Sequence, residues 1–286
     1  MNKELARELI GAGVHFGHAV SRWNPKMQPY IFGKRGMIHI INVKETLKGL
    51  IIAKKLLENV VSNGRDVVFV GTKRQAKKAV QDASEKCGMH YVSERWLGGT
   101  LTNFRTIRSR LQRLEELESM DSTGSIEAQS KKQGARLKRE LSKIKTNLDG
   151  IRKMNRMPGA MVVVDAKKEY IALREARKLG IPTIALMDTD SDPDTVDVAI
   201  PGNDDSIKAI EILMDQLATA VAEGKTMVRQ EDVTTMGPAR VQRARTSRRR
   251  VLASAQEEES QGDESLSEVS VPDAPEMSQT SEAGAQ

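Results

Sequence analysis

The stretch VVFVGTKRQAKK, residues 67–78, decides the expected fold. Its first four residues are apolar and rich in β-branched side chains, and a turn at Gly71 separates them from a stretch with helical character. A short apolar run of this kind predicts a buried strand, and the order strand, turn, helix is typical of a βαβ unit. The stretch therefore predicts an α/β core around a parallel sheet.

The same alternation continues on both sides of this stretch. Further apolar runs predict strands, and the longer stretches between them predict helices. The expected strands are Ile38–Asn42, Val67–Gly71, Tyr91–Val92, Met161–Asp165, Thr183–Met187 and Val198–Ile200, and the expected helices cover residues 44–62, 73–87, 167–179 and 205–223. All of these strands are expected to belong to the same βαβ arrangement.

One insertion interrupts this rhythm between the strands at Tyr91 and Met161. It is far longer than a crossover needs, and much of it is charged. Each of its two arms carries one apolar stripe at helical spacing: Phe104, Ile107, Leu111, Leu114 and Leu117 in the first, and Leu137, Leu141, Ile144, Leu148 and Ile151 in the second. With a turn at residues 121–125, this pattern predicts an antiparallel helical hairpin. One longer helix packed on the core is the alternative.

We expect three parts in the chain. The α/β core covers residues 1–102 and 154–225, the hairpin covers 103–153, and a largely disordered tail covers 226–286. The tail begins basic, with seven Arg in residues 229–250, and ends acidic, with nine Asp or Glu and no Lys or Arg in 251–286. Such a composition cannot bury enough apolar surface to fold alone.

Charge is the first clue to function. The chain carries a net +6 (45 − 39), but without the acidic end residues 1–250 carry +15 (45 − 30). A strongly basic body predicts a phosphate-bearing partner such as nucleic acid, with a merely solvated surface as the alternative. The lone Cys87 indicates a reducing cytosol, and neither a signal peptide nor an apolar run of about 20 residues is present. We therefore expect a cytoplasmic protein without membrane contact.

An enzyme of nucleotides or sugar phosphates is the main competing hypothesis, because α/β sheets often bind such ligands. The turn after Val70 has only Gly71 of the dinucleotide motif G-x-G-x-x-G and lacks the phosphate-binding P-loop motif. No nucleophile with a neighbouring base appears either. What remains is a helix start beside Lys73, Arg74 and Lys77, which suits the phosphates of a polynucleotide. An exposed basic face on a crossover helix is the alternative.

Both tryptophans lie in Gly- or Pro-containing loops next to cations. Trp23 is followed by Lys26, and Arg95 precedes Trp96. Aromatic rings beside cations can stack on bases while the cations bind phosphate. The alternative is that each ring fixes its loop to the core.

An acidic stretch, DTDSDPD at residues 188–194, follows a predicted strand, where α/β sheets form ligand crevices. It is no calcium loop, because Pro193 stands where that loop needs Gly. With Asp204 and Asp205 it could hold a divalent ion, or its carboxylates could cap the loop. His15 and His18 suit a metal or acid–base role, with packing or RNA contact as the alternative.

Eight motifs in this order resemble those of the bacterial-type small-subunit ribosomal protein S2 family. They are GVHFGH (13–18), WNPKM (23–27), IHIIN (38–42), VGTKRQA (70–76), RWLGGTLTN (95–103), GIP (180–182), DTDSDPD (188–194) and IPGNDD (200–205). The resemblance covers about residues 1–225 and leaves the tail out. It implies a Rossmann-like, flavodoxin-type α/β fold, with helices on both faces of a parallel sheet and an inserted coiled-coil hairpin.

The resemblance also implies a function. Proteins of this family are RNA-binding scaffolds between the head and body of the small ribosomal subunit, they help to recruit ribosomal protein S1, and they are not enzymes. We expect no homo-oligomer, and the remaining alternative is a regulatory RNA-binding protein that acts off the ribosome. The RNA-binding candidates are Trp23, Lys26, Lys73, Arg74, Lys77, Arg95, Trp96, Arg105 and Arg108. A divalent metal, zinc or magnesium, is implied at His15, Asp188, Asp204 and Asp205.

Overall fold

The computed structural model of the protein describes residues 3–126 and 128–235. Met1–Glu231 form one compact unit, and almost all of the second unit, Asp232–Gln286, lies outside the described residues. The predictions for most of the Arg-rich run and for the acidic end therefore concern residues that the structure does not describe. Within the described part, no helix is both long and apolar enough to cross a membrane.

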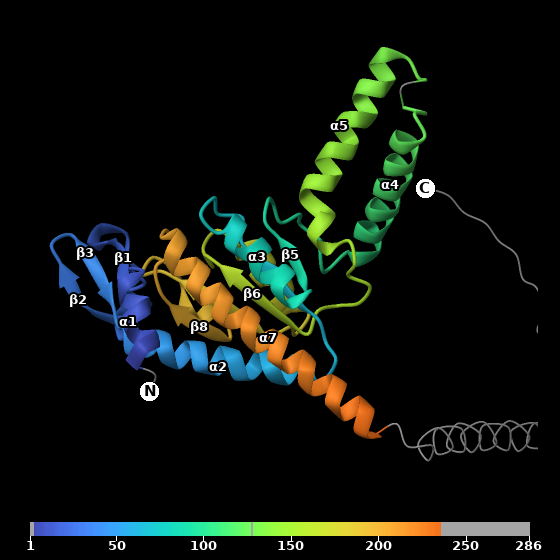
Figure 1. The fold of residues 1–286 in the computed structure, drawn as a ribbon. Coiled ribbons are helices and arrows are strands. Elements are labelled where there is room, and N and C mark those ends of the chain that lie inside the picture. Colours follow the sequence, from blue (N-terminus) through green and yellow to red (C-terminus); the bar gives the residue numbers. More distant parts are fainter. Residues whose placement is uncertain (1–2, 127, 236–286) are drawn as a thin grey trace, which may run out of the picture. The chain divides into compact units, whose positions relative to one another are not determined.

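The main sheet has five parallel strands (Figure 1). Their bounds are β4 Val67–Val70, β5 His90–Val92, β6 Ala160–Val164, β7 Thr183–Met187 and β8 Val198–Pro201, in the spatial order β5-β4-β6-β7-β8. Counted along the chain within this sheet, the order is 2-1-3-4-5, which is the flavodoxin order. The predicted fold class is confirmed, and the switch in strand order falls between β4 and β6.

A second, antiparallel sheet corrects one prediction. It consists of β1 Phe16–Ala19, β2 Ile31–Arg35 and β3 Ile38–Ile41, in the order β1-β3-β2. The run Ile38–Asn42, expected in the parallel sheet, is therefore a hairpin strand. Gly36, at φ 62°, turns the chain between β2 and β3, so the run pairs with its own neighbour before any crossover. Apolar content alone does not distinguish these two kinds of strand.

Alternate residues of the main strands face two separate cores. Val67 and Phe69 lie in a core with α1 Lys3–Gly11, α2 Val43–Ser62, α3 Lys77–Cys87 and α7 Ile207–Thr235. Val68 and Val70 lie in the other core, with α6 Tyr170–Lys178 and the root of the hairpin. Burial on both faces explains why these strands have no polar alternation.

The inserted segment is a helical hairpin, as predicted, and not one longer helix. Helix α4 covers Phe104–Ser122 and α5 covers Lys131–Leu148, and the two lie side by side in Figure 1. The predicted stripes meet, because Leu111, Leu114, Leu117, Ile144 and Leu148 are buried in one cluster. That cluster continues into the core below α6, so the root of the hairpin also covers the sheet.

The helix boundaries that differ most from the predictions are the start of α3 and the end of α7. The turn Lys73–Ala76 precedes α3, which begins at Lys77 and not at residue 73. Helix α7 continues to Thr235, so residues 226–235, which we assigned to the tail, are helical. The division into core, hairpin and tail remains a prediction in its exact bounds.

Candidate metal cluster and RNA interface

The carboxyl ends of the parallel strands meet at one edge of the sheet, and charged residues gather there. Lys73 follows β4, Asp165 follows β6, Asp188 follows β7, and Asp204 comes after β8. His18 reaches the same edge from the small sheet. We refer to His18, Lys73, Asp188, Asp204 and Asp205 as the edge cluster.

Strand β1 packs tightly on the loop after β7. The backbone N–H of His18 donates to Asp188 Oδ1 (3.1 Å) and Thr189 Oγ1 (3.0 Å). A Cβ on Gly17 would lie 2.7 Å from Thr189 Cγ2, so only glycine allows this approach. The imidazole is thereby placed with Nδ1 2.7 Å from Asp188 Oδ2 and Nε2 3.5 Å from Asp205 Oδ2.

Lys73 compensates the carboxylates on the other side of the edge cluster. Its Nζ lies 2.6 Å from Asp204 Oδ1, 2.7 Å from Asp205 Oδ1 and 3.8 Å from Asp165 Oδ2. The Asp204 side chain is only 1% exposed, and the Lys73 side chain is 15% exposed. A buried carboxylate is costly unless an opposite charge compensates it, so this contact is part of the fold.

Burial and pairing shift the pKa values of this cluster. Burial raises the pKa of Asp204 to about 7, although the hydrogen bond from Lys73 opposes the shift. Close contact with the Asp188 carboxylate raises the pKa of His18 to about 9 against the effect of burial. Burial works to lower the pKa of Lys73, but the hydrogen bonds to Asp204 and Asp205 outweigh it and raise that pKa. The positive charges of His18 and Lys73 therefore do not fully compensate the negative charge of the carboxylates at this edge.

Three side chains of the edge cluster fit a divalent cation. One ligand atom each of His18, Asp188 and Asp204 lies within 4.8 Å of the others. His18 Nδ1 is buried and makes no aligned hydrogen bond among the described residues, although Asp188 is close. A nitrogen and two carboxylate oxygens that converge in this way are a donor set that zinc accepts, whereas magnesium prefers oxygen alone.

His15, which we expected as a metal ligand, is not among these three converging side chains. Its ring lies 4.2 Å from that of Phe16, and its Nδ1 is buried without a partner in the described part of the chain. His15 lies in the turn before β1, whereas His18 lies in β1 itself, so different parts of the chain position the two histidines. His18 takes the place that we expected for His15.

The acidic stretch after β7 is divided between the edge cluster and the capping of its own loop. Asp188 belongs to the edge cluster, whereas Asp192 Oδ1 accepts from the backbone N–H of Asp194 (3.1 Å) and so caps its own loop. Asp190 pairs with Lys167 at 2.9 Å.

Side chains of the protein itself fill the switch point between β4 and β6. The backbone N–H of Thr72 donates to Glu169 Oε1 (3.1 Å), and the Thr72 hydroxyl also donates to this oxygen. Burial raises the pKa of Glu169. In flavodoxin-type sheets a ligand occupies this crevice, and Glu169 takes one of the backbone N–H groups that its phosphate would need. The geometry disfavours the nucleotide-enzyme hypothesis.

Several predicted RNA-binding residues have partners within the protein. Lys26 pairs with Asp192 (2.9 Å) and Asp194 (2.6 Å), and Lys77 pairs with Glu94 (2.5 Å). Lys73 is held in the edge cluster, so it is no free ligand for phosphate. The remaining four predicted cations are exposed and have no ion-pair partner among the described residues: Arg74, Arg95, Arg105 and Arg108.

The two tryptophans differ. Trp23 is half-buried, with its ring 5.2 Å from that of His39, and part of it stays accessible. Trp96 is only 6% exposed, and its Nε1 donates to Glu175 Oε1 (3.3 Å). A ring buried to this extent cannot stack on a base, so the prediction of an RNA contact for Trp96 is corrected in favour of the alternative: it fixes its loop to the core.

Glu175, which the sequence analysis missed, organises the loop from Trp96 to Thr102. Its carboxylate accepts from the backbone N–H groups of Gly99 (2.7 Å), Leu101 (3.0 Å) and Thr102 (3.2 Å). Burial works to raise the pKa of Glu175, but these hydrogen bonds outweigh it and lower the pKa. The side chain lies in α6, far from the loop in sequence, so no local signal pointed to it.

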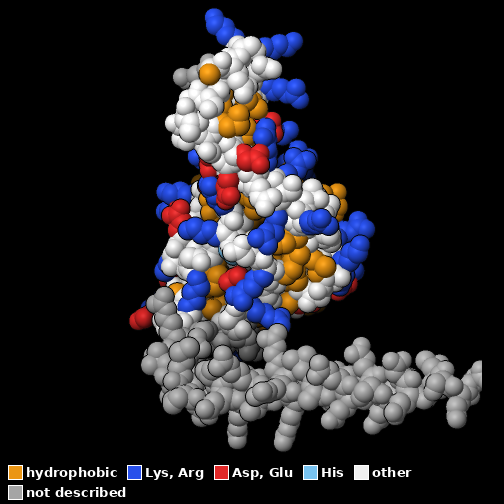
Figure 2. Space-filling model, turned by 90° about the vertical axis from the view of Figure 1, so that its right-hand side faces the viewer, with side chains coloured by type: hydrophobic (Ala, Val, Ile, Leu, Met, Phe, Trp, Pro, Cys, Tyr) orange, Lys and Arg blue, Asp and Glu red, His pale blue; other side chains and the backbone are white. Residues whose placement is uncertain are grey.

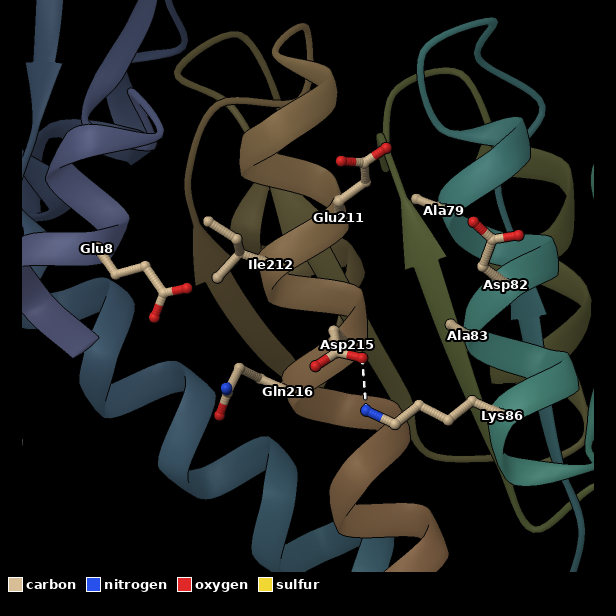
Figure 3. Close-up of a pocket in the computed structure, with 9 residues that line it drawn as sticks. All are labelled: Glu8, Ala79, Asp82, Ala83, Lys86, Glu211, Ile212, Asp215 and Gln216. Carbon is tan, nitrogen blue, oxygen red and sulfur yellow. Dashed lines mark hydrogen bonds and ion pairs between the residues drawn. The ribbon is translucent and has the colours of Figure 1, made fainter. Parts of the chain in front are cut away.

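A groove between α1, α3 and α7 is acidic (Figure 3). It has a volume of about 500 Å³, and Glu8, Asp82, Glu211 and Asp215 line it. Lys86 reaches across to Asp215 at 2.5 Å. None of the lining residues is His, Ser or Cys, and the nearby Cys87 is buried with its pKa raised to about 11. The groove therefore holds no pair of nucleophile and base.

Basic side chains dominate other parts of the surface. In Figure 2, Lys and Arg side chains project along one edge of the helical hairpin and are spread over the face of the core below it. Asp and Glu are fewer on this face. Such a surface suits a partner that carries phosphate.

Comparison with known proteins agrees with this geometry. Residues 9–224 match the family described as Ribosomal protein S2. The chain is 57% identical over 231 residues to the small ribosomal subunit protein uS2 of Rhodopirellula baltica, which covers 81% of this chain and 89% of that protein. It is 48% identical over 221 residues to uS2 of Koribacter versatilis, covering 77% and 73%. The chain therefore belongs to the ribosomal protein S2 family.

Proposed function

We propose that the chain is a structural component of the small ribosomal subunit and binds the RNA of that subunit in the cytoplasm. One observation carries this proposal: identity of 57% and 48%, over most of both chains, to proteins named small ribosomal subunit protein uS2. This family consists of structural proteins and not of enzymes. The occupied switch point and the unpaired surface cations support the same conclusion. A position between head and body of the subunit is part of the proposal.

Sucrose-gradient sedimentation at physiological salt tests this function. We expect the chain to co-sediment with the small subunit at about one copy per subunit. A chain that remains at the top of the gradient and still binds RNA would instead be a regulatory RNA-binding protein. Saturable heat on titrating the isolated protein with nucleotides or sugar phosphates would support the enzyme hypothesis.

We further propose that the small sheet helps to recruit ribosomal protein S1. Four large apolar side chains are exposed on or beside its strands: Phe32 (79%), Met37 (74%), Ile38 (44%) and Phe16 (42%). Apolar side chains gathered in this way mark protein–protein contacts, because water contact with them is unfavourable. A protein neighbour fits this surface better than RNA does.

The double variant Phe32→Ser, Met37→Ser tests the S1 surface. Subunits that carry it should contain less S1, with unchanged occupancy of this chain. The matched control is Ile51→Ser, Ile52→Ser in α2, which removes two other exposed apolar side chains (52% and 54%). Equal S1 content in both kinds of subunit would exclude the small sheet as its docking surface.

We also propose that His18, Asp188 and Asp204 bind zinc. A bound cation would supply charge that stabilises the two buried carboxylates and would hold β1 on the loop after β7. Metal analysis of the purified protein should find close to one zinc per chain, and Asp204→Asn should reduce it. Asp82→Asn, in the acidic groove, serves as the control. Equal zinc content in the two variants would disprove the assignment.

A further inference from the structure

The two faces of the helical hairpin differ in whether their cations are paired with carboxylates. Helix α5 carries seven Lys or Arg and a single Glu, whereas α4 carries four Arg and four acidic residues. The excess of positive charge on α5 cannot be compensated within the hairpin. The positions of the paired and unpaired cations therefore indicate which face of the hairpin is suited to a negatively charged partner.

One face is compensated by its own carboxylates. Arg113 pairs with Glu116 (2.9 Å) and Glu140 (3.5 Å), and Lys145 lies 3.8 Å from Glu118. Arg152, just beyond α5, reaches Glu118 at 2.7 Å and Glu115 at 3.9 Å. Binding of an external anion to these cations would be weak, because the existing ion pairs would have to break first. We refer to this as the paired face.

A groove between α4, α5 and the loop before α4 is lined by cations that are not paired within the described part of the chain. It has a volume of about 790 Å³, and four cations line it: Arg110, Arg136, Arg139 and Lys143. All four are exposed, and none has a carboxylate partner among the described residues. The sole acidic side chain in the lining, Glu140, lies against Arg113 of the paired face.

The lining also indicates the chemistry of the partner. The apolar residues at the floor are largely buried, with Ile107 at 5%, Ile144 at 9% and Leu148 at 2% exposure. Three of the four large apolar side chains of the lining are therefore closed to a docking protein helix, and only Leu97 remains partly accessible. The polar groups of the lining are the four cations and the side chains of Asn103, Thr106 and Asn147, which suit phosphate oxygens and ribose hydroxyls.

We propose that this groove holds the sugar–phosphate backbone of a segment of small-subunit RNA, with Arg110, Arg136, Arg139 and Lys143 as its phosphate ligands. The inference rests on the proposed ribosomal function and adds a specific site to it. None of these four residues stands among the RNA-binding residues expected from the sequence.

Two triple variants of the full chain test the proposal. The groove variant is Arg110→Gln, Arg139→Gln, Lys143→Gln, and the control on the paired face is Arg113→Gln, Lys145→Gln, Arg152→Gln. Each lowers the net charge by three, and Gln is as good a helix former as Lys or Arg. Circular dichroism and thermal unfolding establish that both fold.

The measurement is affinity for small-subunit RNA as a function of salt. The groove variant should lose about two to three units of the slope of log affinity against log salt and bind roughly 10- to 100-fold more weakly at about 0.15 M salt. The control should lose less than about threefold. Equal losses in both variants would overturn the groove assignment, because net charge alone would explain them.

A cleavage probe gives a second readout that does not depend on affinity. An iron chelate attached at Thr106→Cys should cut the bound RNA by hydroxyl radicals, whereas the chelate at Thr146→Cys, which lines a different cavity, should not. The native Cys87 is buried and does not take the label. RNA cut from neither position, or equally from both, contradicts the proposal.

Other outcomes separate the two proposals. A wild-type chain that neither binds this RNA nor sediments with the subunit disproves the ribosomal function itself. If the wild type and the groove variant bind RNA equally but the groove variant fails to enter subunits, the groove holds an acidic protein segment and the RNA assignment is wrong.

Discussion

The edge cluster of the sheet and the groove of the hairpin both contain cations, but they use them differently. Lys73 at the edge lies within 2.7 Å of two carboxylates and compensates a buried Asp204. Arg110 and Lys143 in the groove are exposed and have no such partner among the described residues. A positive charge near a crevice is thus no guide to RNA binding until its partners are known. Cations at the edge stabilise the fold, and cations of the groove are available to RNA.

The largest difference should appear in stability. Lys73→Ala leaves Asp204 buried without its cation, and such a loss costs about 3 kcal/mol of the free energy of unfolding. Lys143→Ala should change stability by less than about 0.5 kcal/mol, as is usual for exposed positions. Urea unfolding of both variants measures this. A Lys73 variant as stable as the Lys143 variant would remove the distinction between edge and groove.

The loop beside the groove gives the next largest effect. Glu175→Gln replaces a carboxylate that accepts several N–H donors, and it should reduce the free energy of unfolding at neutral pH by about 2 kcal/mol. Fluorescence of Trp96, measured in a Trp23→Phe background, should shift to longer wavelength as the ring becomes exposed. A variant with unchanged emission would show that Glu175 does not hold the loop.

This effect should depend on pH. Because the pKa of Glu175 is lowered in the folded protein, its stabilisation is present above the ordinary carboxyl pKa and is lost as the pH falls through the lowered value. The difference in stability between wild type and Glu175→Gln should therefore shrink on acidification below about pH 4. A difference that is constant from neutral to acidic pH would assign the effect to packing and not to charge.

A smaller effect is expected for RNA affinity at single exposed arginines. Arg74→Gln or Arg95→Gln should each weaken binding by about fivefold at about 0.15 M salt if each neutralises one phosphate. Stability should not change, since neither side chain has an ion-pair partner among the described residues. Filter binding at several salt concentrations separates a lost phosphate contact, which lowers the slope, from a general change in structure.

The smallest effect is expected where a cation is exposed but already paired. Lys26→Ala and Lys77→Gln should alter RNA affinity by less than about twofold, because Asp192, Asp194 and Glu94 already compensate these charges. A large loss of affinity in either variant would show that RNA displaces the carboxylates. In that case pairing would not separate structural cations from RNA-binding ones.

Most of the fold could be predicted because its signals are local. Apolar runs with little polar alternation identified the five parallel strands, and a four-three spacing of Leu and Ile identified the hairpin. The run Ile38–Asn42 was placed in the wrong sheet, since its pairing depends on the turn at Gly36. Strand order came from the family resemblance and not from any pattern in this chain.

The candidate sites could be predicted only in part. The position after a strand pointed to Asp188, and the family resemblance implied His15, Asp188, Asp204 and Asp205, whereas the structure brings His18 to Asp188 and Asp204. Trp96 was a candidate for RNA contact because its hydrogen bond to Glu175, a residue of α6, leaves no local signal in the sequence. The four groove cations were missed because basic residues on an amphipathic helix look alike in sequence.

The sequence by itself determined the α/β class, the hairpin, the family and the excess of positive charge, since each follows from composition, periodicity or short motifs. Only the tertiary structure decided which charges are compensated. Lys73 and Asp204 are 131 residues apart in the chain and 2.6 Å apart in space. Coulomb attraction and desolvation depend on distance and burial, and neither can be read along the chain.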